Sequence, residues 1–184
     1  GQMWYNSTDK VVKGFTSNPA GTWSTGSSLN TARSFLGGAG ANTEAALGFG
    51  GGPPPAPTAK NQTESWNGSS WTEVNDLNEK KAFVAGAGTY TSAIAAGGDQ
   101  YSGTAESWNG SSWTNITDEP DGGMGYGSAG ADSEDALFFG GYSTAGNTFN
   151  RYWNGSSWTE LGDLNTGRNN LGGSGKTYTA ALAF

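Results

Sequence analysis

The hexapeptide Trp-Asn-Gly-Ser-Ser-Trp occurs three times in this chain of 184 residues, and no other feature of the sequence restricts the fold as strongly. The copies occupy residues 66–71, 108–113 and 153–158, and Trp23 gives a fourth copy of the second tryptophan. The intervals between the four corresponding tryptophans are 48, 42 and 45 residues. A period of about 40–50 residues indicates four similar structural units.

The register also holds inside each unit. A glycine follows each of these tryptophans by 17 residues, and in the first three units an apolar stretch ending in a glycine pair comes next. Turn residues divide each unit into four short strands, which we expect in the second unit at residues 83–89, 92–96, 104–108 and 113–116. This pattern predicts an all-β protein made of propeller-like blades. The four glycines are Gly40, Gly88, Gly130 and Gly175.

Composition excludes several classes of protein. The 32 glycines and 6 prolines disfavour long helices, while 8 Trp, 7 Tyr and 8 Phe are too many for a flexible linker. The chain has no Cys and no His, which excludes disulfides, thiolate zinc sites and a Ser-His-Asp triad. The acidic stretch at residues 118–123 lacks the ligand spacing of an EF-hand and is interpreted as a turn. We expect no catalytic residues, no metal and no cofactor.

The net charge of −7 predicts that the surface repels phosphate backbones, so we expect no nucleic-acid partner. The sequence has no apolar run of about 18 residues, and we expect no membrane insertion. The first residues lack the features of a secretory signal, so either a leader has been removed or none existed. Composition alone leaves the compartment open.

Each Asn-Gly-Ser-Ser sequence predicts a hairpin turn, because Asn and Gly tolerate positive φ. If all four residues form the loop, the flanking tryptophans are direct cross-strand neighbours, whereas a two-residue turn would place them diagonally. Recurrence in every unit favours a role in the blade core over a carbohydrate-stacking surface. The tryptophans to which we assign this structural role are Trp23, Trp66, Trp71, Trp108, Trp113, Trp153 and Trp158.

Residues 23–184 resemble the kelch-type β-propellers, whose repeat has an apolar strand ending in Gly-Gly and then two spaced aromatic residues. Gly97-Gly98 with Trp108 and Trp113 match this pattern, although the first aromatic residue is Trp instead of the usual Tyr and the two are closer together. The sequence Glu-Ser-Trp-Asn-Gly-Ser-Ser-Trp-Thr is similar to kelch-like arrays in tail-fibre and surface proteins of marine phages and bacteria. Residues 1–10 resemble a short hairpin of phage tail proteins. The resemblance implies an extracellular or virion-surface location.

A propeller removes its sheet edges by closing into a ring. The last unit contains only two predicted strands, at residues 168–175 and 178–184, and we expect residues 10–16 and 22–26 to complete it, with Phe15 and Trp23 in the tryptophan positions. The predicted fold is therefore a single domain of four blades of four antiparallel strands, forming a monomeric ring. Its parts are residues 1–26 (closing strands), 27–74, 75–116 and 117–161 (continuous blades) and 162–184 (inner strands of the split blade).

Charged residues recur in the first two units. Glu64 and Glu106 each lie two residues before a tryptophan. Ten residues after a tryptophan stand Arg33, Lys81 and, in the last unit, Arg168. We interpret them as the ion pairs Arg33 with Glu64 and Lys81 with Glu106, and we expect the third unit to lack such a pair. A pair of catalytic carboxylates is the alternative interpretation of the two glutamates.

The segments after the glycine pairs differ between units, and unlike loops on a uniform scaffold are typical of recognition surfaces. We therefore hypothesise a non-catalytic binding or structural module that recognises a glycan or a cell-surface protein. The alternatives are a carboxylate-dependent glycan hydrolase or lyase, and a fragment of a longer array with a purely structural role, in which the parent protein could oligomerise. The candidate ligand-binding residues are Asp99, Gln100, Tyr101, Tyr142 and Asn147 in the loops, and Trp4 and Tyr5 outside the repeats.

Overall fold

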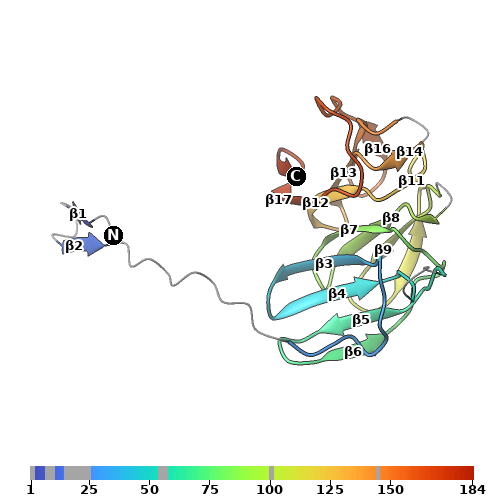
Figure 1. The fold of residues 1–184 in the computed structure, drawn as a ribbon, viewed down its shortest axis with the longest axis horizontal. Coiled ribbons are helices and arrows are strands. Elements are labelled where there is room, and N and C mark those ends of the chain that lie inside the picture. The colour runs from blue at the N-terminus through green and yellow to red at the C-terminus, as the bar shows by residue number, and fades with distance from the viewer. Residues whose placement is uncertain (1–2, 7–10, 15–25, 54–57, 100–101, 144–145) are drawn as a thin grey trace.

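The computed structural model describes residues 3–6, 11–14, 26–53, 58–99, 102–143 and 146–184. The described residues form β-strands joined by turns and contain no helix, and so none that could span a bilayer. Figure 1 shows the strands gathered into short antiparallel sheets that follow one another along the chain. The expected all-β class is confirmed.

Three sheets have four antiparallel strands each, paired in chain order. Sheet 1 contains β3 (Gly37–Asn42), β4 (Ala45–Phe49), β5 (Thr63–Trp66) and β6 (Trp71–Val74). Sheet 2 contains β7 (Ala85–Gly88), β8 (Ala93–Ala96), β9 (Ala105–Trp108) and β10 (Trp113–Ile116). Sheet 3 contains β12 (Gly127–Asp132), β13 (Asp135–Phe139), β15 (Asn150–Trp153) and β16 (Trp158–Glu160). The four strands expected in the second unit are all present: β10 has the expected bounds, β8 and β9 begin one residue later, and β7 begins two residues later and ends one residue earlier.

Three further sheets have two strands. Sheet 4 pairs β17 (Gly173–Thr177) with β18 (Ala180–Ala183), and β11 (Gly123–Met124) pairs with β14 (Tyr142–Ser143). The strand β17 begins later than the expected residue 168, because Asn170 has a positive φ of 50° that interrupts extended backbone.

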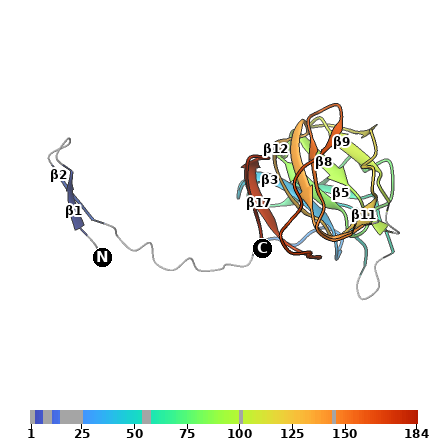
Figure 2. The ribbon, with the colours of Figure 1, turned by 90° about the horizontal axis from the view of Figure 1, so that it is seen from above.

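The N-terminal strands differ from the expected closure of the ring. β1 (Met3–Asn6) pairs with β2 (Val11–Gly14), and in both views they lie apart from the other sheets (Figure 1, Figure 2). The expectation that residues 10–16 pair with the last strand is therefore wrong for β2, whose partner among the described residues is β1. Phe15 and Trp23 lie outside the described residues.

A series of backbone hydrogen bonds joins the four sheets. One residue just before each inner strand has a positive φ, and its N–H donates to the carbonyl of its counterpart in the preceding unit. The bonds run from Phe83 to Phe35 at 2.9 Å, from Gly125 to Phe83 at 3.0 Å and from Asn170 to Gly125 at 3.1 Å. Among the described residues no such bond joins Phe35 to Asn170, so the series is open between these two residues.

The hydrophobic core lies between successive sheets. Leu47 and Phe49 of sheet 1 pack with Trp108 and Trp113 of sheet 2, and Phe138 of sheet 3 belongs to a second cluster with residues of sheet 2. Sheet 4 adds only half-buried residues, Ala181 and Ala183, to the third cluster. Sheets 2 and 3 therefore have a neighbouring sheet packed on each face.

Candidate functional site

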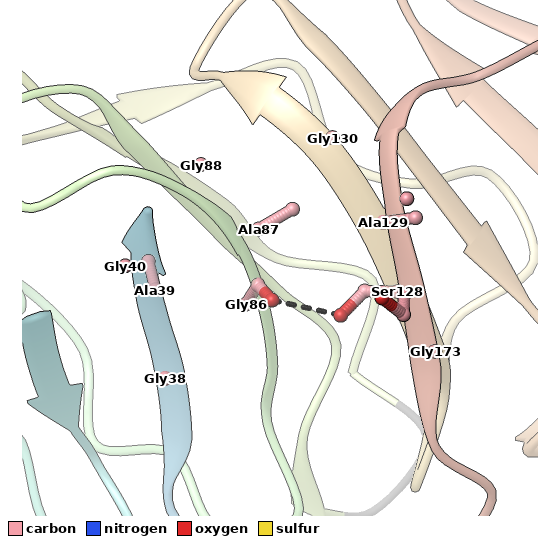
Figure 3. A pocket seen from close by; sticks show the side chains of 12 residues that line it. Gly38, Ala39, Gly40, Gly86, Ala87, Gly88, Ser128, Ala129, Gly130 and Gly173 are labelled. Atoms are coloured by element: carbon pink, nitrogen blue, oxygen red, sulfur yellow. Dashed lines mark hydrogen bonds between the residues drawn. The ribbon is translucent and has the colours of Figure 1, made fainter. Parts of the chain in front are cut away.

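The inner strands of the four units line one axial cavity of about 230 Å³. Figure 3 shows β3, β7, β12 and β17 around it, with Ser128 Oγ donating to the Gly86 carbonyl at 2.7 Å. Each strand contributes three consecutive residues at the same repeat positions, and these are only Gly, Ala and Ser. The lining residues are 38–40, 86–88, 128–130 and 173–175.

The cavity widens at the end of the inner strands where they turn into the second strands. This wider part has a volume of about 460 Å³ and is lined by Thr89, Ala131 and Lys176, among other residues. No carboxylate belongs to the lining of either part. The axial cavity can therefore offer hydroxyl and backbone hydrogen bonds and, at its mouth, the amino group of Lys176.

The paired tryptophans face one another across each hairpin. Trp66 pairs directly with Trp71, Trp108 with Trp113 and Trp153 with Trp158, so all four intervening residues form the loop. The ring centroids of the three pairs are 5.4, 5.4 and 5.1 Å apart. In the first turn Asn67 Oδ1 accepts bonds from the N–H groups of Ser69 and Ser70, both at 3.0 Å.

The indole N–H groups tie the hairpins to other strands and to other sheets. Trp108 Nε1 donates to the Tyr90 carbonyl at 3.0 Å, within sheet 2. Trp113 Nε1 donates to Thr63 Oγ1 of sheet 1 at 3.1 Å, and Trp158 Nε1 donates to the Thr117 carbonyl at 2.7 Å. These tryptophans are therefore engaged in packing within and between sheets.

The two expected ion pairs are present and buried. Arg33 Nη2 lies 2.8 Å from Glu64 Oε1, and Lys81 Nζ lies 3.9 Å from Glu106 Oε1. Both cations come from the segment that leads into a sheet, which we call the crossover, and both carboxylates come from the third strand of that sheet. Burial lowers the pKa of the Lys81 amino group, and the neighbouring Glu106 opposes this effect.

Each carboxylate also accepts backbone hydrogen bonds. The N–H of Asn78 donates to Glu106 Oε2 at 2.7 Å and the N–H of Glu79 donates to Oε1 at 3.1 Å. Glu64 accepts corresponding bonds from Asn30 and Thr31 at 2.7 and 3.5 Å. A glutamate placed in this way holds the crossover against the sheet.

The expectation that the third unit lacks an ion pair is wrong, because the charges are exchanged. Arg151 occupies the strand position of the glutamates, and it pairs with Asp121 of the crossover and lies 3.6 Å from Glu119. Burial raises the pKa of the Glu119 carboxyl, which also accepts a bond from Tyr126 at 3.2 Å. The sequence signal for this pair was the presence of Glu119 and Asp121 on the crossover together with Arg151 on the third strand.

The loop candidates are only partly brought together. Tyr142 and Asn147 line a shallow pocket of about 320 Å³ with Ser143 and Gly146, and Tyr142 is 40% exposed. Asp99 lies on a different loop and does not line this pocket, and burial raises the pKa of its carboxyl.

The other candidate ligand residues remain predictions. Gln100 and Tyr101 lie outside the described residues. Trp4 and Tyr5 belong to β1, where they are opposite Lys13 and Val12.

Comparison with known proteins gives no assignment. No protein-family model matches the chain, and no curated protein matches it. Function therefore has to be argued from the geometry of the described residues.

Proposed function

We propose that the four sheets are consecutive blades of a small kelch-like β-propeller, which serves as a non-catalytic binding or structural module of a phage tail fibre or a surface protein. Two features of the arrangement support this architecture. Equivalent inner strands line one axial cavity, and the same backbone hydrogen bond recurs between successive units. The proposed location is outside the cell or on the virion.

The observation that carries the binding role is the contrast between the repeated residues and the loops. The repeated tryptophans and charged side chains contact one another, a neighbouring sheet or the crossover that leads into their own sheet. The loop after Gly140-Gly141, by contrast, presents Tyr142 and Asn147 in one open pocket. An exposed aromatic ring beside an amide can stack on a sugar ring and bond its hydroxyls, so we propose a glycan, or a glycosylated surface protein, as the ligand.

No observation favours the hydrolase or lyase alternative. Glu64 and Glu106 belong to different sheets, and each accepts backbone hydrogen bonds beside its own cation. The axial cavity has no carboxylate in its lining.

A glycan array probed with the 184-residue chain tests the proposal. We expect selective binding that Tyr142→Ala reduces at least tenfold, because the ring provides the stacking surface. Tyr90→Ala is the matched control: this tyrosine is 48% exposed but lies in the turn between β7 and β8, at the opposite end of the strands. Equal loss in both variants, or no binding by the parent chain, would favour a purely structural role.

A further inference from the structure

Within the part of the chain that the structure describes, sheet 4 has no outer pair of strands like those of sheets 1 to 3. Within the described residues β18 pairs with β17 along one edge only. Leu182 and Phe184 are 70% and 69% exposed, whereas their counterparts in sheet 1, Leu47 and Phe49, are 2% and 0% exposed. An apolar strand with an open edge is a site for adding another strand.

The crossover that leads into sheet 4 is nevertheless placed like the crossover into sheet 2. Leu164 N–H donates to the Thr148 carbonyl at 2.7 Å, as Leu77 N–H donates to Asn61 at 2.9 Å. The Arg168 carbonyl accepts a bond from Gly141, and the Lys81 carbonyl accepts one from Gly51, both at 2.7 Å. Arg168 therefore occupies the position of Lys81.

In sheet 2 this crossover holds the third strand through its glutamate. Asn78 and Glu79 direct their N–H groups to the Glu106 carboxylate, Lys81 faces it, and Asn78 Nδ2 donates to the Trp113 carbonyl at 3.1 Å. The corresponding residues before sheet 4 are Asn165, Thr166 and Arg168. They line an open pocket of about 170 Å³ together with Leu164 and Ala183 of β18.

These residues form a potential binding site for a carboxylate. Lys81 and Arg33 are buried against their glutamates, whereas Arg168 is exposed and, among the described residues, has no acid within ion-pair distance. In all three complete sheets the crossover and the third strand carry opposite charges. By the same pattern, the positive charge of Arg168 predicts an acidic residue on a third strand that would complete sheet 4.

We propose that the free edge of β18 and this pocket bind an antiparallel β-hairpin of the same repeat type, supplied from outside residues 1–184, with a glutamate two residues before its first tryptophan. The register of the complete sheets fixes the pairing. Gly48 lies opposite Glu64 and Ala95 lies opposite Glu106, so Ala183 lies opposite the glutamate of the bound hairpin. The glutamate meets the guanidinium of Arg168, and its tryptophan lies opposite Ala181.

The N-terminal segment of this chain is a poorer match in charge. If Phe15 occupied the first tryptophan position, Lys13 would stand where the glutamate belongs and would meet Arg168 with a like charge. Lys13 is also part of β2, which is already paired with β1.

A labelled peptide with the sequence of residues 63–74, added to the full 184-residue chain, tests the proposal by fluorescence anisotropy. We expect saturable binding that weakens at least tenfold when Arg168 is changed to Gln or when Glu64 of the peptide is changed to Gln. The two changes together should cost little more than either alone, because they remove one shared interaction. Lys176→Gln, an exposed cation on β17, is the matched control and should leave binding unchanged.

Three other outcomes would overturn the proposal. A peptide of residues 9–26 that binds more tightly would identify the N-terminal segment as the occupant, and so would binding of the 63–74 peptide only after Trp23→Ala. Association of the chain with itself that Arg168→Gln abolishes would identify a second copy. Failure of the glycan proposal is distinguishable from failure here, because Tyr142→Ala should not alter peptide binding.

Discussion

At the scale of single residues, the inner strands depend on glycine where neighbouring backbones approach. A Cβ added to Gly86 would lie 2.7 Å from the Gly38 carbonyl oxygen and would overlap the ring of Phe49. A Cβ on Gly173 would similarly collide with the Ser128 carbonyl. Gly38 holds the corresponding position in β3, yet its nearest neighbour would be the Leu47 carbonyl at 3.5 Å, an ordinary contact. The difference exists because no described strand lies beside β3 on that side.

Gly86→Ala should therefore destabilise the protein by about 1–3 kcal/mol, since the neighbouring strand or Phe49 must move. Gly38→Ala, the matched control, should be neutral or slightly stabilising because the added methyl group has space and restricts the unfolded chain. Urea unfolding monitored by tryptophan fluorescence measures both. A loss of stability for Gly38→Ala equal to that for Gly86→Ala would mean that another strand covers β3 in solution.

At the scale of elements, the crossovers are fixed by buried charge. The Glu106 carboxylate accepts hydrogen bonds from two backbone N–H groups of the crossover and faces Lys81. Both side chains are buried, with exposed fractions of 1% for Glu106 and 2% for Lys81. Removing one charge leaves the other in an environment that solvates it poorly, which is more costly than losing an exposed pair.

Glu106→Gln should accordingly lower the free energy of unfolding by about 2–4 kcal/mol, because Lys81 loses its buried counter-ion and keeps only the half-exposed carboxylate of Glu79, 3.7 Å away. Glu73→Gln, on the exposed part of β6, is the control and should change it by less than about 0.5 kcal/mol. Thermal unfolding followed by circular dichroism gives both values. Equal small effects would show that the pair is solvated in the native state.

The elements also show how far a single sequence can predict this structure. Strands, hairpin turns and the first two ion pairs follow from local patterns, because glycine pairs, Asn-Gly turns and spacing from a tryptophan are properties of one unit. The exchanged pair of Arg151 with Asp121 was missed because an ion pair between a crossover and a strand depends on opposite charge and not on which side carries it. The pairing of β2 with β1 was missed because several registers satisfy so short a strand.

At the scale of the whole molecule, the sheets differ in how well their neighbours cover them. All four residues of β8 are fully buried at 0% exposure between sheets 1 and 3, whereas β18 is open along one edge and exposes Leu182 at 70%. Stability should therefore fall from the middle sheets to sheet 4, because backbone hydrogen bonds open locally where fewer packed groups hold them.

Hydrogen–deuterium exchange measures this gradient directly. We expect the amides of Ala93–Ala96 to exchange at least about 100-fold more slowly than those of Ala180–Ala183, because β8 can exchange only when two neighbouring sheets separate while β18 needs only its pairing with β17 to open. Saturating peptide 63–74 should slow exchange in β18 without affecting β8, since a strand added at the open edge covers only sheet 4. Uniform protection of both strands in the free chain would contradict this prediction and would mean that another strand already covers the edge of β18 in solution.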